Sequence, residues 1–118
     1  MLSILVVDDS SFMRGAIKYD LVDMDCNFIE ASSGEEAVCL YKDHRPALVI
    51  MDYTMCGMSG VDALKAIREY DISARVIMCS AMGQNSIVVD AVRAGALDFI
   101  VKPFAPGAIA FAVKKYLP

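Results

Sequence analysis

Five short apolar runs alternate along this chain with longer stretches in which apolar residues recur at helical spacing. Each run has four to six residues and is mostly continuous, which is typical of parallel strands covered on both faces. The runs lie at 3–7, 26–31, 47–51, 75–79 and 98–101. The pattern predicts five strands, each followed by a helix. Because such crossovers are right-handed, we expect an α/β fold, a doubly wound five-stranded parallel sheet with five helices on its two faces.

Local signals mark several ends of the expected helices. Ser33 and Glu36 have the spacing of a capping box, in which each side chain accepts a hydrogen bond from the other residue's backbone. Gly95 suits the C-terminus of a helix, because glycine readily adopts a left-handed conformation. Pro106 suits the first turn of the last helix, where no backbone N–H is needed.

Composition limits the compartment and the partners. A chain of 118 residues has room for one domain, which we expect to span 1–118. Hydrophobic residues make up 57%, yet no apolar stretch reaches the roughly 18 residues of a membrane span, and the N-terminal MLSILVV lacks the basic start of a signal peptide. A net charge of −4 opposes direct binding to nucleic acid. We therefore expect a cytoplasmic protein that binds neither membranes nor nucleic acid.

The four cysteines form no C-x-x-C pair, so the sequence predicts neither a disulfide framework nor a zinc site. They are Cys26, Cys39, Cys56 and Cys79.

Polar residues follow four of the five expected strands. Asp8 and Asp9 follow the first run, Asp52 the third, Ser80 the fourth and Lys102 the fifth. Since ligands bind beyond the carboxyl ends of such strands, these side chains should converge. Three carboxylates within ~5 Å would repel by several kcal/mol per pair, so the site needs a proton, the lysine or a metal. Oxygen ligands with open positions favour Mg²⁺.

Asp52 has the surroundings of a nucleophile in this arrangement. A carboxylate beside Mg²⁺ and a lysine can attack phosphorus to form an aspartyl phosphate, and Ser80 would donate a hydrogen bond to the phosphoryl group. Taken singly, the residues have simpler interpretations. The Asp-Asp-Ser string could be a helix N-cap, Asp52 a solvated strand end and Lys102 a surface lysine. Their joint placement at matching strand ends favours a functional site.

Four motifs resemble the receiver domains of two-component response regulators, in particular the single-domain CheY type of chemotaxis. They are VVDDS, MDYTMCGMSG, CSAMG and DFIVKPF, in the family's order and spacing. The resemblance covers the whole chain and implies the flavodoxin-like strand order 2-1-3-4-5. It implies a phosphoacceptor switch rather than an enzyme, with self-phosphorylation from phosphodonors and slow self-dephosphorylation as its only chemistry.

The resemblance also implies roles for the site residues. Asp52 would accept a phosphoryl group from a CheA-like histidine kinase. Lys102 would pair with the phosphoryl oxygens, and the Lys102–Pro103 bond would be cis. The implied Mg²⁺ ligands are Asp8, Asp9, Asp52 and the backbone carbonyl of Thr54.

A conformational switch and an output surface are implied as well. The hydroxyl of Ser80 would move toward the phosphoryl group and the ring of Phe99 would turn inward. This change would alter the face formed by the fourth helix, the fifth strand and the fifth helix, where a motor switch protein or a dedicated phosphatase would bind. The resemblance also implies that the protein is a monomer. Candidate residues of that face are Val89, Val92 and Lys115.

The sequence departs from the family pattern at several positions. Cys56 replaces a usual proline, which we interpret as a neutral change rather than a redox sensor. Phe99 replaces a common tyrosine. Thr54 and Met82 stand where other receivers carry groups that position attacking water, and because neither is a good base we expect slow self-dephosphorylation.

Three other functions remain as alternatives. An aspartyl-phosphate phosphatase would want a second acid two residues after the nucleophile, where this chain has Thr54. A flavodoxin-like cofactor binder would need a glycine- or hydroxyl-rich loop where this chain has Asp8 and Asp9. The main alternative is a receiver domain excised from a larger regulator, because the chain ends abruptly at 117–118. The lone His44 is expected on the surface and not as a phosphoacceptor.

Overall fold

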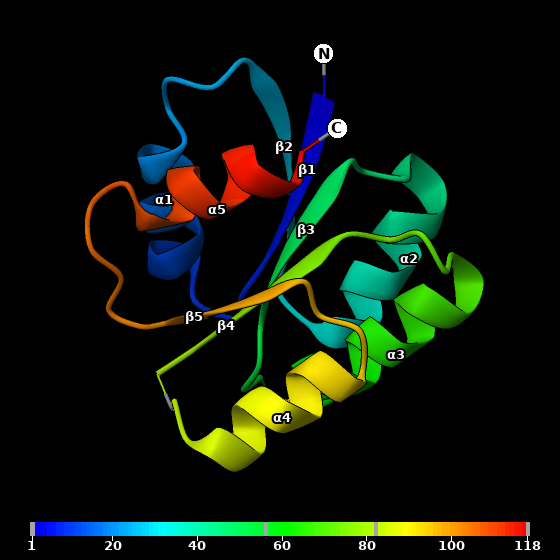
Figure 1. Ribbon diagram of the computed structural model, residues 1–118. Helices are drawn as coiled ribbons and strands as arrows, with labels where there is room; N and C mark the ends of the chain where they lie inside the picture. Colours follow the sequence, from blue (N-terminus) through cyan, green and yellow to red (C-terminus); the bar gives the residue numbers. More distant parts are fainter. Residues whose placement is uncertain (1, 56, 82, 118) are drawn as a thin grey trace.

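A computed structural model describes residues 2–55, 57–81 and 83–117 (Figure 1). Within them, five parallel strands form one sheet in the order β2-β1-β3-β4-β5, and a helix follows each strand along the chain. The predicted α/β fold and strand order are confirmed. The strands are β1 (Leu2–Val7), β2 (Cys26–Ala31), β3 (Leu48–Asp52), β4 (Val76–Ser80) and β5 (Asp98–Val101). The helices are α1 (Ser11–Asp20), α2 (Gly34–His44), α3 (Gly60–Tyr70), α4 (Asn85–Arg93) and α5 (Ala108–Tyr116).

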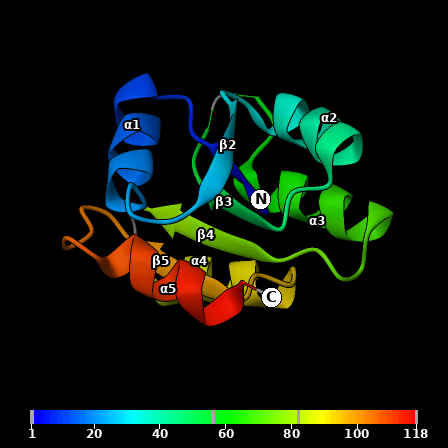
Figure 2. The same ribbon diagram turned by 90° about the horizontal axis from the view of Figure 1, so that it is seen from above.

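The helices form two layers, one on each face of the sheet. Helices α1 and α5 cover one face, and α2, α3 and α4 cover the other (Figure 1). Seen from above, α1 and α2 lie on opposite sides of β2 (Figure 2). Each layer buries its own hydrophobic cluster, with Ile17 and Val113 on the α1/α5 side and Leu64 and Ile67 on the other. The two buried faces explain why the central strands read as continuous apolar runs.

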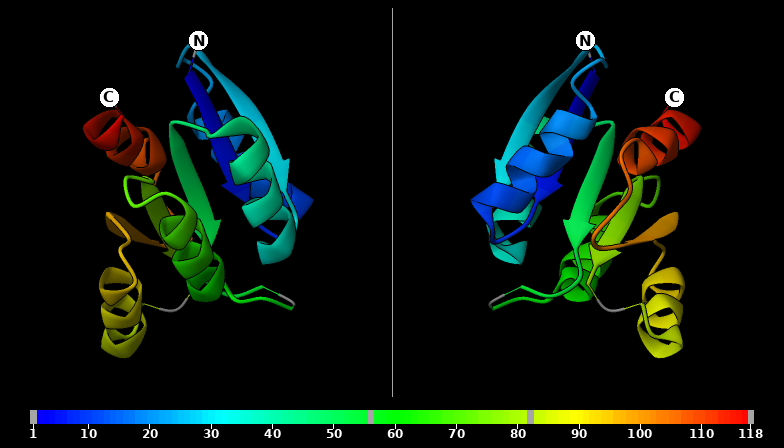
Figure 3. Two further views of the ribbon diagram at one scale, coloured as in Figure 1. Left: turned by 90° about the vertical axis from the view of Figure 1, so that its right-hand side faces the viewer. Right: turned by 90° about the vertical axis from the view of Figure 1, so that its left-hand side faces the viewer.

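Two central strands are shifted relative to the sequence prediction. β3 and β4 each begin and end one residue later than the runs 47–51 and 75–79. The ladder continues through the polar residues, because Asp52 pairs with Cys79 and Ser80 pairs with Val101. Asp52 and Ser80 are therefore the last residues of their strands rather than the first residues of loops. The arrows of β2 (cyan) and β3 (green) point to the same end of the sheet in Figure 3.

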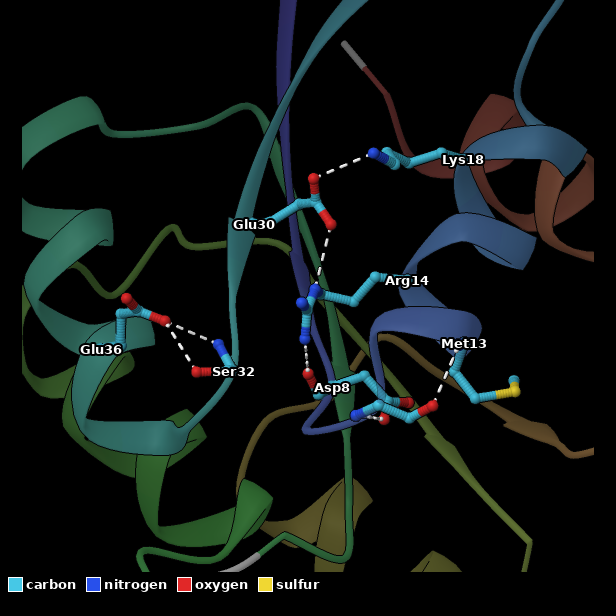
Figure 4. Close-up of polar contacts among 8 residues, drawn as sticks. Asp8, Met13, Arg14, Lys18, Glu30, Ser32 and Glu36 are labelled. Carbon is cyan, nitrogen blue, oxygen red and sulfur yellow. Dashed lines mark hydrogen bonds and ion pairs between the residues drawn. The ribbon is translucent and has the colours of Figure 1, made fainter.

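The N-terminus of α2 carries a variant of the predicted capping box. The Ser33 hydroxyl accepts a hydrogen bond from the Glu36 N–H at 3.1 Å, as predicted. The Glu36 carboxylate, however, accepts from the N–H of Ser32 at 2.6 Å rather than from that of Ser33 (Figure 4). Two backbone donors are still satisfied at the helix start. The prediction for Gly95 is confirmed, because it follows α4 with φ of 106°.

The prediction that Pro106 begins the last helix is wrong. Helix α5 begins at Ala108, and a turn closed by the Ala108 N–H on the Ala105 carbonyl at 3.0 Å precedes it. Gly107 has φ of 85° and no side chain to cap the helix. Asp20 of α1 supplies the cap instead, because its carboxylate accepts hydrogen bonds from the N–H groups of residues 107, 109 and 110.

No helix in the described part of the chain is long and apolar enough to cross a membrane. Among the described residues, Cys26, Cys39 and Cys79 are free thiols. Only Cys79 is buried, and burial raises the pKa of its thiol to about 12. Cys56 and Met82, which the sequence singled out, lie outside the described residues.

Candidate functional site

Three carboxylates meet at the carboxyl edge of the sheet. Oxygen atoms of Asp8, Asp9 and Asp52 all lie within 4.8 Å of one another. Asp8 follows β1 and Asp52 ends β3, and these strands are neighbours in the sheet. Asp8 and Asp52 are 2% and 6% exposed, whereas Asp9 is exposed. Of the three acids, Asp9 is therefore the one whose side chain is open to solvent.

Lys102, which follows β5, brings a positive charge into this cluster. Its Nζ lies 2.7 Å from Oδ2 of Asp8 and 3.3 Å from Oδ1 of Asp52. Burial alone would lower the pKa of Lys102, but the hydrogen bond to Asp8 and the negative charge of Asp52 outweigh it and raise the pKa above its ordinary value. The lysine is therefore a stable ammonium at neutral pH.

The ionisation of Asp52 is unfavourable in this environment. Burial raises its pKa, the negative charge of Asp8 raises it further, and the ammonium of Lys102 offsets only part of the effect. When all four groups are ionised, three carboxylates and one ammonium leave a local charge of −2. A divalent cation has the charge and the preference for oxygen ligands to balance this site.

Every polar group of Asp8 has a partner. Its Oδ1 accepts from the Ser10 N–H at 2.9 Å, and its Oδ2 from Lys102. Its N–H donates to the Ala31 carbonyl at 3.1 Å, and its own carbonyl accepts from Arg14 at 2.6 Å (Figure 4). The position of this carboxylate is thus set by β2, by α1 and by the residue after β5.

The N-cap interpretation of the Asp-Asp-Ser string holds for its serine. The Ser10 hydroxyl caps α1 by accepting a hydrogen bond from the Met13 N–H at 3.2 Å (Figure 4). The preceding carboxylates are left to form the acidic cluster. One short string therefore serves both the helix and the site.

The remaining predicted residues surround the cluster. The buried Ser80 ends β4, and its carbonyl accepts a hydrogen bond from the Lys102 N–H at 2.7 Å. The Lys102–Pro103 peptide bond is cis. Thr54 has an exposed side chain, and its N–H donates to Oδ1 of Asp52 at 3.4 Å. Phe99 is half-buried and packs against the hydrophobic cluster shared by α2, α3 and α4.

Sequence reasoning missed two residues near the site, Arg14 and Glu30. Arg14 binds a backbone carbonyl and Glu30 binds Arg14, at 3.0 Å. Every residue has a backbone carbonyl, so the sequence does not indicate which carbonyl a side chain will bind. The only signal for Arg14 was its position one turn after the helix N-cap, from which its side chain can reach the preceding loop. His44 is exposed at the end of α2, as expected.

A doubly wound sheet with an acidic cluster, a buried hydroxyl and a lysine at its carboxyl edge defines the receiver class of signalling domains. The chain belongs to the response regulator receiver domain family, whose profile matches residues 4–114. It is 53% identical to the chemotaxis protein CheY of Bacillus subtilis over 97% of this chain and 96% of that protein. It is 46% identical to CheY of Thermotoga maritima over 95% of this chain and 94% of that protein.

A solved structure agrees with this assignment. The CheX–CheY–BeF₃–Mg²⁺ complex from Borrelia burgdorferi contains a chain that matches with a TM-score of 0.91 and 36% identity. The match covers 99% of this chain and 90% of that chain. The protein is therefore a CheY-like receiver domain.

Proposed function

We propose that this receiver domain is a phosphoacceptor switch of chemotaxis, in which Asp52 takes a phosphoryl group from a phosphohistidine of a CheA-like kinase in a Mg²⁺-dependent reaction. The observation that carries the proposal is the position of Asp52. Its buried carboxylate lies 3.3 Å from the Lys102 ammonium, which also pairs with Asp8 at 2.7 Å, and within 4.8 Å of the Asp8 carboxylate. The identity with CheY proteins supports the role in chemotaxis.

The residues present fit a magnesium ion. The donor set consists of oxygen atoms only, which Mg²⁺ prefers, and one of its three carboxylates, Asp9, is exposed to water. When bound, Mg²⁺ would neutralise charge on the transferring phosphoryl group. The ligands that we propose are Asp8, Asp9, Asp52 and the backbone carbonyl of Thr54.

The protein's own groups would position the acceptor and stabilise the product. An oxygen of Asp52 attacks phosphorus, a P–O bond forms, and the P–N bond of phosphohistidine breaks with its electron pair returning to the imidazole. Lys102, now held by two carboxylates, would turn toward the new phosphoryl oxygens. Ser80, at the end of the adjacent strand, would donate its hydroxyl to the same group.

The output would be a change in protein binding. Movement of Ser80 toward the phosphoryl group and rotation of Phe99 would alter the surface of α4, β5 and α5. That surface already presents apolar side chains, since Val89, Val92 and Phe111 are exposed. Lys115 on α5 is also exposed. We propose that a motor switch protein or a dedicated phosphatase binds there, as CheX accompanies CheY in the Borrelia complex.

Phosphotransfer from a kinase tests this function. A CheA-type kinase, autophosphorylated with labelled ATP, should pass its label to the wild-type chain within the mixing time and to Asp52→Asn not at all. Asp62→Asn, on the exposed start of α3, is the matched carboxylate control and should accept label normally. Label that reaches Asp52→Asn as readily as the wild type would contradict the proposal. A labelled product that decays within seconds without partners would contradict slow self-dephosphorylation.

A further inference from the structure

A side chain of α1 holds the main chain of the loop between β1 and α1, which carries Asp8 and Asp9. Nη1 of Arg14 donates to the carbonyl oxygen of Asp8 at 2.6 Å, and the Arg14 side chain is only 17% exposed. Arg14 begins the first hydrogen-bonded turn of α1, because its N–H donates to the carbonyl of the N-cap Ser10. Its side chain reaches back from the helix to the loop (Figure 4).

Glu30 of β2 fixes the guanidinium from the other side. Its Oε1 accepts from Nε of Arg14 at 3.0 Å, and its Oε2 accepts from Nζ of Lys18 at 2.9 Å (Figure 4). These hydrogen bonds from Lys18 and Arg14 lower the pKa of Glu30, which is therefore ionised at neutral pH. Because the guanidinium is planar and rigid, two anchored nitrogen atoms determine its orientation.

The contact with Arg14 controls a peptide plane within the site. The carbonyl of Asp8 and the N–H of Asp9 belong to the same planar peptide unit, so holding the carbonyl also sets the direction in which Asp9 leaves the loop. The amide and both carboxylate oxygens of Asp8 have other partners. Arg14 is the residue that holds this carbonyl, and Asp9, which is exposed, has little packing of its own to fix it.

We propose that Arg14 is a positioning residue for the metal site: by holding the Asp8 carbonyl, and being held by Glu30, it orients the two adjacent carboxylates for Mg²⁺. The inference rests on the proposed function, since it concerns the metal that the phosphoacceptor reaction requires. Partners of metal ligands that lie outside the ligand set are typically worth ten- to a hundredfold in metal affinity.

Charge and positioning predict opposite results for removal of Arg14. Loss of a positive charge near three carboxylates should strengthen Mg²⁺ binding, whereas loss of the hydrogen bond to Asp8 should weaken it. Lys18 is the matched control, because it also pairs with Glu30 but makes no contact with Asp8. Arg14→Met and Lys18→Met each remove one charge and keep an apolar stem.

The test is the dissociation constant for Mg²⁺, measured by calorimetric titration with MgCl₂ on wild type and variants whose circular dichroism spectra show a native fold. We expect Arg14→Met to weaken Mg²⁺ binding about tenfold and Lys18→Met to leave it unchanged or tighter. Glu30→Ala should weaken it in the same direction by a smaller factor. Equal affinities of Arg14→Met and Lys18→Met would overturn the inference, as would tighter binding by Arg14→Met.

Phosphorylation by acetyl phosphate distinguishes a failure of the Arg14 inference from a failure of the proposed phosphoacceptor function. At saturating MgCl₂, the aspartyl phosphate of Arg14→Met should form at the wild-type rate, because the defect lies in metal affinity. A merely structural role would instead slow the reaction at every Mg²⁺ concentration and would contradict the inference. A wild-type protein that neither binds Mg²⁺ nor forms an adduct would overturn both the proposed function and the role of Arg14.

Discussion

The ammonium of Lys102 lies 2.7 Å from a carboxylate oxygen of Asp8, so an ion pair joins the residue after β5 to the residue after β1. These strands are not neighbours, because β3 and β4 lie between them in the sheet. Asp52 ends β3 and lies 3.3 Å from the same ammonium. Asp52 thus shares its ammonium partner with an ion pair that spans the sheet edge, and under the proposed function the lysine would exchange carboxylate partners for phosphoryl oxygens.

Removal of this ammonium should separate metal binding from phosphorylation. In Lys102→Met, Mg²⁺ should bind as well as in the wild type or more tightly, because the carboxylates lose a competing cation. Adduct formation from acetyl phosphate should slow about 100-fold, because a group that stabilises the transferring oxygens is gone. Calorimetry with MgCl₂ and a time course of intact mass measure the two effects. Adduct formation at the wild-type rate would refute the role of Lys102.

The raised pKa of Asp52 predicts a pH-dependent gain in stability when its charge is removed. A carboxyl group whose folded pKa exceeds its unfolded value destabilises the fold once pH rises above the unfolded pKa, near 4. Without metal, Asp52→Asn should therefore melt several degrees higher than the wild type at neutral pH. The difference should vanish below about pH 4, where both side chains are uncharged.

Magnesium should shift this comparison in favour of the wild type. Mg²⁺ stabilises the form that binds it, and Asp52→Asn lacks one of the proposed ligands, so the melting temperature of the wild type should rise more on addition of MgCl₂. Melting curves in EDTA and in MgCl₂ at acid and neutral pH give all the comparisons. A variant less stable than the wild type in EDTA at neutral pH would contradict the electrostatic account of Asp52.

Asp71, remote from the site, should show the opposite pH dependence. Hydrogen bonds from Ser73 and Tyr41, together with the charge of Arg45, lower its pKa to about 2. Its stabilising effect is present above the unfolded pKa and is lost as pH falls through about 2. Asp71→Asn should cost about 1 kcal/mol at pH 7 and nothing at the acid limit.

Urea unfolding at several pH values measures this difference. Asp43→Asn, on the exposed side of α2, is the control and should change the free energy of unfolding by less than about 0.5 kcal/mol. A cost for Asp71→Asn that stays constant from neutral to acid pH would show that its charge is not what stabilises the fold.

Two glycines should respond oppositely to alanine. A Cβ on Gly60 would meet the carbonyl oxygen of Asp52 and the backbone of Tyr53, which cannot move aside without displacing the end of β3. Gly60→Ala should therefore cost about 2 kcal/mol and slow phosphorylation. Gly15, exposed within α1, has nothing near its added Cβ, so Gly15→Ala should stabilise by about 0.5 to 1 kcal/mol. Urea unfolding compares them, and a neutral Gly60→Ala would contradict the packing at Asp52.

The fold was predictable because a strand that is buried on both faces appears in the sequence as a continuous apolar run. The runs ending at Met51 and Cys79 are continuous because both faces of β3 and β4 are covered, and the sequence located them to within one residue. The resemblance supplied the strand order, which local patterns do not contain. The convergence of Asp8, Asp52 and Lys102 followed from the rule that parallel strands end at one edge.

Contacts to the backbone were not predictable. Asp20 caps α5 through three N–H groups of a helix far along the chain, and Arg14 holds the carbonyl of Asp8. Every residue has an N–H and a carbonyl, except that proline lacks the N–H, so these partners have no sequence signature. The place of Pro106 before α5 was not predictable for the same reason, because the cap from Asp20 lets the helix begin after a turn.

The most direct test of the central claim is the intact mass of the protein after incubation with acetyl phosphate and MgCl₂. The wild type should gain a single phosphoryl group, EDTA should abolish the gain, and Asp52→Asn should show none while Asp62→Asn behaves as the wild type. A gain that persists in Asp52→Asn would place the acceptor elsewhere. A folded, Mg²⁺-bound wild type that gains no phosphoryl group would show that this acidic edge binds metal for another purpose.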